Sequence, residues 1–407
     1  MPDLISIEEA RRRVLAEVRP LAAEEVPLDR ALGRVLAAEI VSTVDVPPFD
    51  ASAMDGFAVA ETSGGELRLA GESRAGHPSR VRVEKGTAVA ISTGAAIPEG
   101  SAAVVPVERT TLSDGSVRVE AVRKDANIRR AGEDVLKGAR VMRPGTELDP
   151  AAIGVLAGVG VRAPRCARRP RVALAATGDE LVDPGSELGP GRIWSSNPLA
   201  LAGQTAWAGA EVVHTQTVRD DPGATRAALG RALSDADVVC VSGGVSVGEH
   251  DHVKGALEEL GVKERFWGVA LQPGKPTWFG VAERPVGSVA EGTVLVFGLP
   301  GNPVSAMVTF HLFARPALRA LQGADPLPRT ASAVLDEPMR RNPRRDQAVR
   351  CSLTAEDDGW HARSTGPQGS HVMTSMMGAD ALAIVPRGEG DLAAGERVRI
   401  EFLDRRV

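Results

Sequence analysis

Glycine, serine and acidic residues follow an apolar run in the segment 237–251, DVVCVSGGVSVGEHD. The run Val238–Val241 is typical of a strand that is buried on both faces of a sheet. Glycines let the backbone approach a ligand and turn its N–H groups toward an anion, and Glu249 and Asp251 offer oxygen ligands for a divalent cation. The segment predicts a phosphate-plus-metal site, although a tight strand-to-helix turn needs the same glycines. Its candidate binding residues are Ser242, Gly243, Gly244, Ser246 and Gly248.

Two further loops of this kind end other apolar runs, namely AATGDEL (175–181) and GLPGNPVS (298–305). Ligands of open α/β sheets bind at the carboxyl ends of the strands, and helix N-termini bind phosphate. Three such loops in one sheet predict a nucleotide-like ligand, and the alternative is that all three are only tight turns. The candidate residues in these two loops are Thr177, Gly178, Glu180, Pro300, Gly301, Asn302, Pro303 and Ser305.

Asp220 and Lys275 are two further candidates for ligand binding. Asp220 and Asp221 follow the run EVVHTQTV, and we expect Asp221 to cap the next helix and Asp220 to reach the ligand. Lys275 lies between prolines in PGKP. A rigidly placed ammonium group suits an oxyanion, whereas an exposed turn lysine is the simpler alternative.

Three more loops precede the predicted sheet. PPFDASAMDGFAV contains Asp55, ISTGAAIPEG contains Thr93, and RRAGEDV contains Asp134. Each could be an ordinary turn, and composition alone does not connect any of them with the sheet.

The elements that position these residues follow from hydrophobic periodicity. Between residues 171 and 321 four apolar runs alternate with helical segments, which predicts a doubly wound, mainly parallel sheet. Upstream, the strand-like segments LRLAG, RVRVE, TAVAIST, AAVVPVE and SVRVE predict a small all-β module. Helices are predicted over 6–18, 28–40 and 151–161, and packing of the last against the first two would make the β-module an insertion. After the sheet the pattern is strand-like to the end.

These patterns predict four domains. They are a split N-terminal domain of residues 1–46 and 136–168, an inserted β-module of residues 47–135, the sheet domain of residues 169–325, and a C-terminal β domain of residues 326–407.

Composition excludes several classes of protein. At 407 residues, with 43% hydrophobic and 25% charged residues, the chain is predicted to be globular with several domains. A net charge of −5 implies no general attraction to nucleic acid. The three cysteines lack CxxC spacing, which argues against disulfides and a cysteine zinc site. Without an apolar signal core or a membrane-spanning run, we expect a cytoplasmic protein. Walker A, HExxH and GxSxG motifs are absent, which argues against P-loop and hydrolytic chemistry.

Seven motifs together resemble those of the molybdopterin molybdenumtransferase family, which includes the MoeA proteins and the E domain of gephyrin. They are PPFDASAMDGFAV, ISTGAAIP, RRAGEDV, ATGDEL, SGGVSVGEHD, QPGKP and GLPGNPVS, in the family's order. QGSHVMTSMMGADALAIVP also resembles the family's C-terminal signature. The resemblance implies a multidomain α/β fold: an elongated split N-terminal domain, an inserted β-module, a doubly wound molybdopterin-binding sheet domain and a C-terminal β-barrel-like domain. It also implies a homodimer whose active site lies between the sheet domain of one subunit and the β-module of the other.

The resemblance implies insertion of molybdate into adenylylated molybdopterin, with Mg²⁺ and release of AMP. Cations and hydroxyl groups are needed for the molybdate dianion, and Lys275, Ser305, Arg350 and Ser375 stand at matching motif positions. Since no nucleophilic side chain is required, positioning and charge neutralisation would supply most of the catalysis. The expected catalytic residues are Asp55, Thr93, Asp134, Glu180, Asp220 and Asp251, and the last three are the expected metal ligands.

Two other functions remain open. A molybdopterin adenylyltransferase would share the sheet domain and its ligand, although that activity needs only the single domain. A gephyrin-like scaffold without catalysis is the other, although the intact acidic motifs argue against it. A molybdopterin adenylyltransferase and recipient molybdoenzymes are the candidate protein partners.

Overall fold

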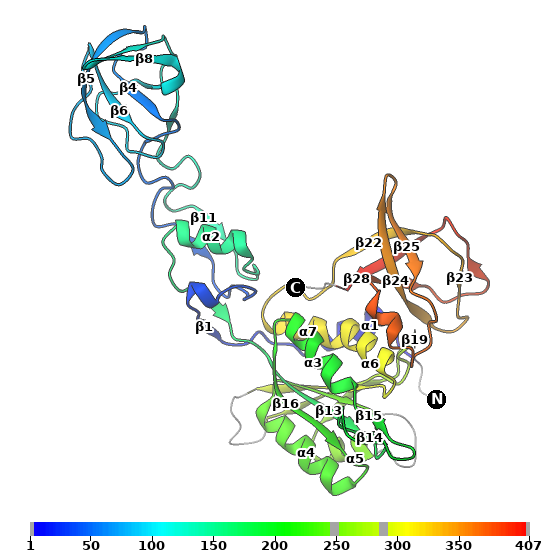
Figure 1. The fold of residues 1–407 in the computed structure, drawn as a ribbon. Helices are drawn as coiled ribbons and strands as arrows, with labels where there is room; N and C mark the ends of the chain where they lie inside the picture. The colour runs from blue at the N-terminus through cyan, green and yellow to red at the C-terminus, as the bar shows by residue number, and fades with distance from the viewer. Residues whose placement is uncertain (1–3, 245–251, 285–291, 404–407) are drawn as a thin grey trace. The chain divides into compact units, whose positions relative to one another are not determined.

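The computed structural model describes residues 4–244, 252–284 and 292–403 and divides into two compact units (Figure 1). We call them the sheet unit and the β-module unit. The sheet unit comprises Met1–Glu24, Gly33–Ala37 and Cys166–Val407, and the β-module unit comprises Glu25–Leu32 and Ala38–Arg165. The short strands β1 (Ala23–Glu25) and β12 (Arg165–Ala167) lie where the chain passes between them.

A six-stranded sheet forms the centre of the sheet unit, in the order β16-β13-β17-β21-β20-β18. Four neighbouring strands run parallel to one another, as expected for a doubly wound sheet; β20 then pairs antiparallel with β21, and β18 pairs antiparallel with β20 as an added hairpin. The parallel strands are β13 (Arg171–Thr177), β16 (Glu211–Val218), β17 (Val238–Ser242) and β21 (Thr293–Leu299), and the hairpin strands are β18 (Lys263–Trp267) and β20 (Trp278–Glu283).

Helices cover both faces of this sheet (Figure 1). The predicted cap is confirmed, since Asp221 Oδ1 accepts a hydrogen bond from the Ala224 N–H at 2.6 Å. The predicted helix after β21 contains a π-helical turn, η3, in its middle. The bounds are α3 (Asn197–Trp207), α4 (Pro222–Asp235), α5 (His252–Glu259), α6 (Pro303–Thr309), η3 (Phe310–Ala314) and α7 (Arg315–Leu321).

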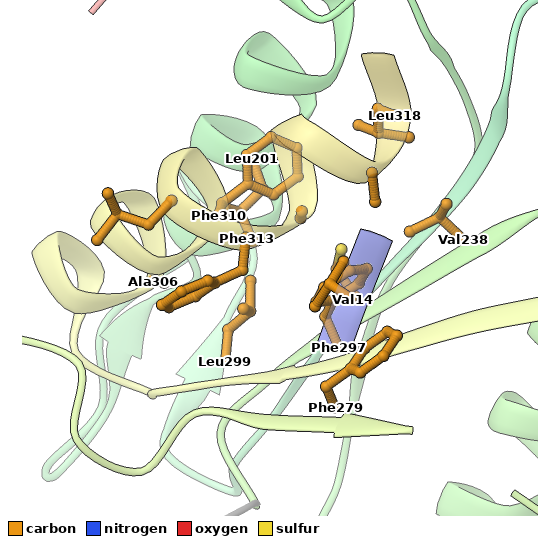
Figure 2. Packing of buried hydrophobic residues seen from close by; sticks show 14 of the residues in the cluster. Val14, Leu201, Val238, Phe279, Phe297, Leu299, Ala306, Phe310, Phe313 and Leu318 are labelled. Atoms are coloured by element: carbon orange, nitrogen blue, oxygen red, sulfur yellow. The ribbon is translucent and has the colours of Figure 1, made fainter. Parts of the chain in front are cut away.

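Successive side chains of a strand point to opposite faces of the sheet, so neighbouring residues pack against different helices. Val172 and Leu174 of β13 belong to a core with α3, α6 and α7, whereas Ala173 and Ala175 pack with α4 and α5. Figure 2 shows the first of these cores, where Phe279 and Phe297 lie beside Val14.

Val14 belongs to α1 (Ile7–Ala16), which starts at the predicted cap Ser6 and packs in the core of the sheet unit. The sequence placed this helix in the split domain of residues 1–46. The structure groups it with the sheet instead, because Ile7, Ala10 and Val14 are buried against the helices and strands of that unit.

The β-module unit contains a six-stranded sheet in the order β7-β4-β6-β5-β9-β8. Beside it, β2 (Ile40–Val41) pairs with β11 (Arg140–Met142), which joins the two sides of the insertion, and α2 spans Pro150–Gly158. The other bounds are β3 (Ala51–Ser52), β4 (Gly56–Val59), β5 (Gly65–Ser73), β6 (Thr87–Ile91), β7 (Ala103–Pro106), η2 (Val107–Arg109), β8 (Thr110–Ser113), β9 (Ser116–Val119) and β10 (Ile128–Arg129).

Two predicted elements in the first 85 residues are wrong. Only Leu28–Arg30 of the segment 28–40 is helical, as the 3-10 turn η1, and Gly33 then has φ +71°. The segment RVRVE (80–84) is a loop and not a strand. Val83 is its only buried residue, and the Val83 N–H donates to the Glu99 carbonyl.

The C-terminal region of the sheet unit is a closed barrel of five strands. The order β24-β25-β22-β28-β26 closes because β26 also pairs with β24, which confirms the predicted β-barrel-like domain. The strand β19 (Leu271–Gln272) pairs with β24 and links this barrel to the sheet. The bounds are β22 (Thr330–Leu335), β23 (Met339–Arg340), β24 (Asp346–Glu356), β25 (Gly359–Ser364), α8 (Thr374–Met377), β26 (Ala381–Val385), β27 (Asp391–Leu392) and β28 (Arg397–Phe402).

Of the helices within the described ranges, none is both long and apolar enough to cross a membrane.

Candidate active site at the carboxyl edge of the sheet

A cavity of about 830 Å³ lies at the carboxyl ends of β13, β17 and β21. The three strand-end loops predicted from the sequence all line it, so the structure brings them together. Its size suits a cofactor-sized ligand. The predicted residues that line it are Thr177, Gly178, Glu180, Asp220, Ser242, Gly243, Gly244, Pro300, Gly301, Asn302 and Pro303.

The turn after β17 depends on two glycines. Gly243 and Gly244 have φ values of +88° and +64°, which residues other than glycine rarely adopt. A Cβ at Gly244 would lie 2.5 Å from Val253 Cγ2, and one at Gly243 would lie 2.8 Å from the Thr177 carbonyl oxygen. The Gly243 N–H donates to the Leu299 carbonyl at 3.1 Å, so this donor is already used within the protein. These glycines therefore let the loops of neighbouring strands pack closely around the cavity.

Asn197 joins two of the loops. Its Nδ2 donates to the Gly301 carbonyl at 2.7 Å and to Ser242 Oγ at 3.3 Å. Its Oδ1 is buried and has no hydrogen-bond partner among the described residues. Asn197 lines the cavity, and its amide nitrogen fixes two of the loops around it.

Several lining residues were not predicted from the sequence. In the sequence, the segment SSNP (195–198) indicates only the start of a helix, and Asn197 is the first residue of α3. The signal that could have found it is an amide side chain directly before the proline at a helix start that follows a strand-end loop. The lining residues that were missed include Ile193, Trp194, Ser195, Ser196, Asn197 and His371.

Glu180 and Asp220 place two carboxylates at the rim. The Asp179 N–H donates to the Asp220 carboxylate, and the Asp220 N–H donates to the Asp179 carboxylate, each at 3.3 Å. This pair of hydrogen bonds ties the loop after β13 to the loop after β16. The Glu180 carboxylate folds over Gly178, where a Cβ would lie 2.4 Å from Oε2. Both carboxylates are exposed and offer the oxygen ligands that Mg²⁺ prefers. The predicted residues Asp251, Ser246 and Gly248 lie outside the described residues.

Arg350 and Ser375 meet beside the cavity and do not line it. Arg350 is only 1% exposed, and its Nε donates to Ser375 Oγ at 3.1 Å. Burial lowers the pKa of the Arg350 guanidinium to about 10, so the group is cationic at neutral pH. The connecting loop reaches the site, because His371 lines the cavity and the Ser370 carbonyl accepts from the Val304 N–H at 3.1 Å.

Lys275 and Ser305 also lie outside the cavity lining. The backbone around Lys275 is held as predicted, since its carbonyl accepts from the Val269 N–H at 3.0 Å and Thr277 Oγ1 donates to the Gly274 carbonyl at 2.6 Å. The adjoining Pro276 lines the cavity, whereas Ser305 is buried in α6.

In the β-module unit, the structure brings Asp55 and Thr93 together. Asp55 Oδ1 accepts from the Thr93 N–H at 2.7 Å, and both residues are exposed. Asp134 is exposed in another loop, where its N–H donates to the Val46 carbonyl at 3.0 Å. The nearby Asp50 carboxylate accepts hydrogen bonds from the Ala131 N–H and the Arg130 guanidinium, and both lower its pKa.

Comparison with known proteins accounts for nearly the whole chain. The MoeA N-terminal region (domain I and II) matches residues 5–160, a probable molybdopterin binding domain matches residues 173–320, and the MoeA C-terminal region (domain IV) matches residues 332–403. The chain is 36% identical to the molybdopterin molybdenumtransferase of Haemophilus influenzae, over 98% of each chain. The chain belongs to the MoeA family.

Further MoeA relatives agree in sequence and in fold. The molybdopterin molybdenumtransferase 2 of Mycobacterium tuberculosis is 38% identical, over 97% of this chain and 98% of its own. The crystal structure of a MoeA protein from Pyrococcus horikoshii superimposes with a TM-score of 0.82 at 29% identity and covers 98% of this chain and 100% of its own. The resemblance seen in the motifs is thereby confirmed. Apart from His371, every residue that lines the cavity falls in the region matched by the probable molybdopterin binding domain.

Proposed function

We propose that this chain inserts molybdate into adenylylated molybdopterin and releases AMP, with Mg²⁺ as the metal. The observation that supports this most directly is the cavity, in which three strand-end loops converge within the region matched by the molybdopterin binding domain. Full-length similarity to proteins named molybdopterin molybdenumtransferase supports the reaction class.

The strand-end loops bind the phosphate-bearing part of the substrate in this proposal. Gly244 and Gly301 allow the backbone to approach the phosphates, and Glu180 and Asp220 hold Mg²⁺ together with Asp251. Bound Mg²⁺ would neutralise phosphate charge as AMP leaves. The carboxylates at the rim suit a hard cation, because all their ligand atoms are oxygens.

Arg350 supports a role for the neighbouring C-terminal loop in molybdate binding. Its guanidinium donates hydrogen bonds to neutral oxygens, namely Ser375 Oγ and the carbonyls of Pro367 and Gly369. Within the described ranges no carboxylate pairs with it. A buried cation without a neutralising carboxylate favours a nearby anion. We propose that Arg350, Ser375, Lys275 and Ser305 bind or position the oxyanion.

The β-module contributes the remaining groups in this proposal. Asp55, Thr93 and Asp134 act at the site of a second subunit, so the active form is a homodimer. The hydrogen bond between Asp55 and Thr93 supports their acting together. Family membership supports the composite site.

The reaction is tested with purified protein, adenylylated molybdopterin and molybdate. We expect molybdate-dependent release of AMP and activation of an apo molybdoenzyme. Asp220→Asn should raise the Mg²⁺ concentration needed for half-maximal rate by at least tenfold, whereas Asp221→Asn, which keeps a capping side chain, should not. Rapid adenylylation of molybdopterin from ATP without molybdate would overturn the insertion reaction in favour of an adenylyltransferase. Equal Mg²⁺ requirements in both variants would exclude Asp220 as a ligand.

A further inference from the structure

One edge of the cavity carries two large apolar residues, Ile193 and Trp194, that have no assigned role. Between β13 and α3 the chain forms two strands, β14 (Leu181–Val182) and β15 (Ile193–Trp194), which pair in parallel. Ile193 and Trp194 line the cavity and are 55% and 49% exposed. Large apolar side chains that remain exposed inside a ligand cavity indicate a surface that the ligand covers.

The indole of Trp194 is held in one orientation. Its Nε1 donates to the Ser186 carbonyl at 3.0 Å. The backbone on both sides of the ring is also fixed, since the Ile193 N–H donates to the Glu180 carbonyl and the Ser195 N–H to the Val182 carbonyl, each at 2.8 Å. The polar atom of the ring is therefore already satisfied within the protein. What the ring offers a ligand is its flat face.

We infer that Trp194 is a stacking platform for a planar, nitrogen-rich ring of the ligand, with Ile193 beside it. This inference rests on the proposed function, whose substrate carries two such rings, adenine and pterin. Aromatic side chains stack on heterocycles of this kind regardless of their substituents.

Trp207 is a matched control on the same unit. It is 46% exposed, close to the value for Trp194, and it ends α3 without lining this cavity. Truncation of either ring removes a similar exposed surface. Only Trp194 should affect ring binding.

The test measures equilibrium binding of two probes, AMP and neopterin, to the full chain. Variants are Trp194→Ala, Trp194→Phe and Trp207→Ala. We expect Trp194→Ala to weaken binding of one probe by roughly tenfold, or about 1.4 kcal/mol, which lies within the range for stacking on an aromatic ring. Trp194→Phe should keep most of the affinity, and Trp207→Ala should match the wild type. The probe that is affected identifies the stacked ring.

Three outcomes would overturn the inference. They are unchanged binding of both probes to Trp194→Ala, an equal loss with Trp207→Ala, and no binding of either probe to the wild type. Melting temperatures equal to the wild type show that each variant is folded. Failure of the proposed function is distinguishable, because it appears as a wild type that binds a probe through Trp194 and yet incorporates no molybdenum.

Discussion

Asn197 holds two strand-end loops together through a single amide nitrogen, and its side-chain oxygen is buried. At the scale of single residues, such side chains are hard to predict. The sequence showed glycine-rich loops and acidic residues, because these types recur at strand ends. It could not show that Asn197 reaches Gly301, which lies 104 positions further along the chain. The contact exists only once α3 is packed against the sheet.

Replacement of Asn197 by alanine tests its role. We expect affinity for adenylylated molybdopterin to fall by up to about thirtyfold, because the two hydrogen bonds that hold the loops in place are lost and each contributes about 1 kcal/mol. Isothermal titration calorimetry measures the affinity.

Asn342→Ala is the control for this prediction. The Asn342 amide donates to Gln272 Oε1 at 2.6 Å and does not line the cavity. A similar loss of affinity in both variants would show that the effect of Asn197 is not specific to the site.

At the scale of elements, buried strands were predicted well, because their apolar runs are continuous. The run Val238–Val241 was predicted as a strand buried on both faces and lies in β17, whose residues are all buried, and the closed barrel lies in the C-terminal region that was predicted to be strand-like. The helix predicted over residues 28–40 was wrong because the apolar residues of this segment are buried in two different units. Val35 and Leu36 belong to the sheet unit, and the residues from Ala38 to Ile40 belong to the other. Local periodicity does not reveal which unit buries a residue.

The turn between β17 and α5 offers a test at this scale. Gly244→Ala forces a Cβ to within 2.5 Å of Val253 Cγ2 at a φ of +64°. We expect the free energy of unfolding to fall by about 1–3 kcal/mol from the combined clash and strain, and substrate affinity to fall with it. Denaturant titration and calorimetry measure the two effects.

Gly255→Ala is the matched control. Gly255 lies within α5, and a Cβ there meets nothing within 4 Å. Alanine in a helix is more favourable than glycine, so this variant should be neutral or more stable by about 0.5–1 kcal/mol. If Gly244→Ala behaved in the same way, the close packing of that turn would not matter for stability.

At the scale of the whole molecule, a buried ion pair links distant parts of the chain within the sheet unit. Arg11 of α1 bonds Glu401 of β28 at 2.9 Å, and its Nε donates to the Leu312 carbonyl at 2.9 Å. The Arg11 and Glu401 side chains are only 6% and 1% exposed. This contact, together with the burial of Ile7 and Val14, explains why α1 belongs to the sheet unit although the sequence placed it elsewhere.

Removal of the pair should be costly. Arg11→Ala removes the bidentate partner of the buried Glu401 carboxylate and leaves its contact with the half-exposed Arg399, and we expect the sheet unit to lose about 3–5 kcal/mol of stability. The control is Arg12→Ala, since Arg12 is 68% exposed and its solvent-screened pair with Glu9 should contribute far less to stability. Denaturant titration compares the two variants, and equal stabilities would contradict the prediction.

The proposed composite site makes the arrangement of subunits decisive for activity. Heterodimers carrying Asp55→Ala in one chain and Asp220→Asn in the other retain one intact site if each site combines the β-module of one subunit with the sheet of its partner. We therefore expect about half of the wild-type rate of molybdenum insertion from dimers purified through two different tags. At a Mg²⁺ concentration that saturates the wild type but not Asp220→Asn, heterodimers with both substitutions in the same chain should be much less active, because each site then contains one altered residue. If the active site lay within a single subunit, the two results would be exchanged, since the doubly substituted chain would leave its wild-type partner fully active.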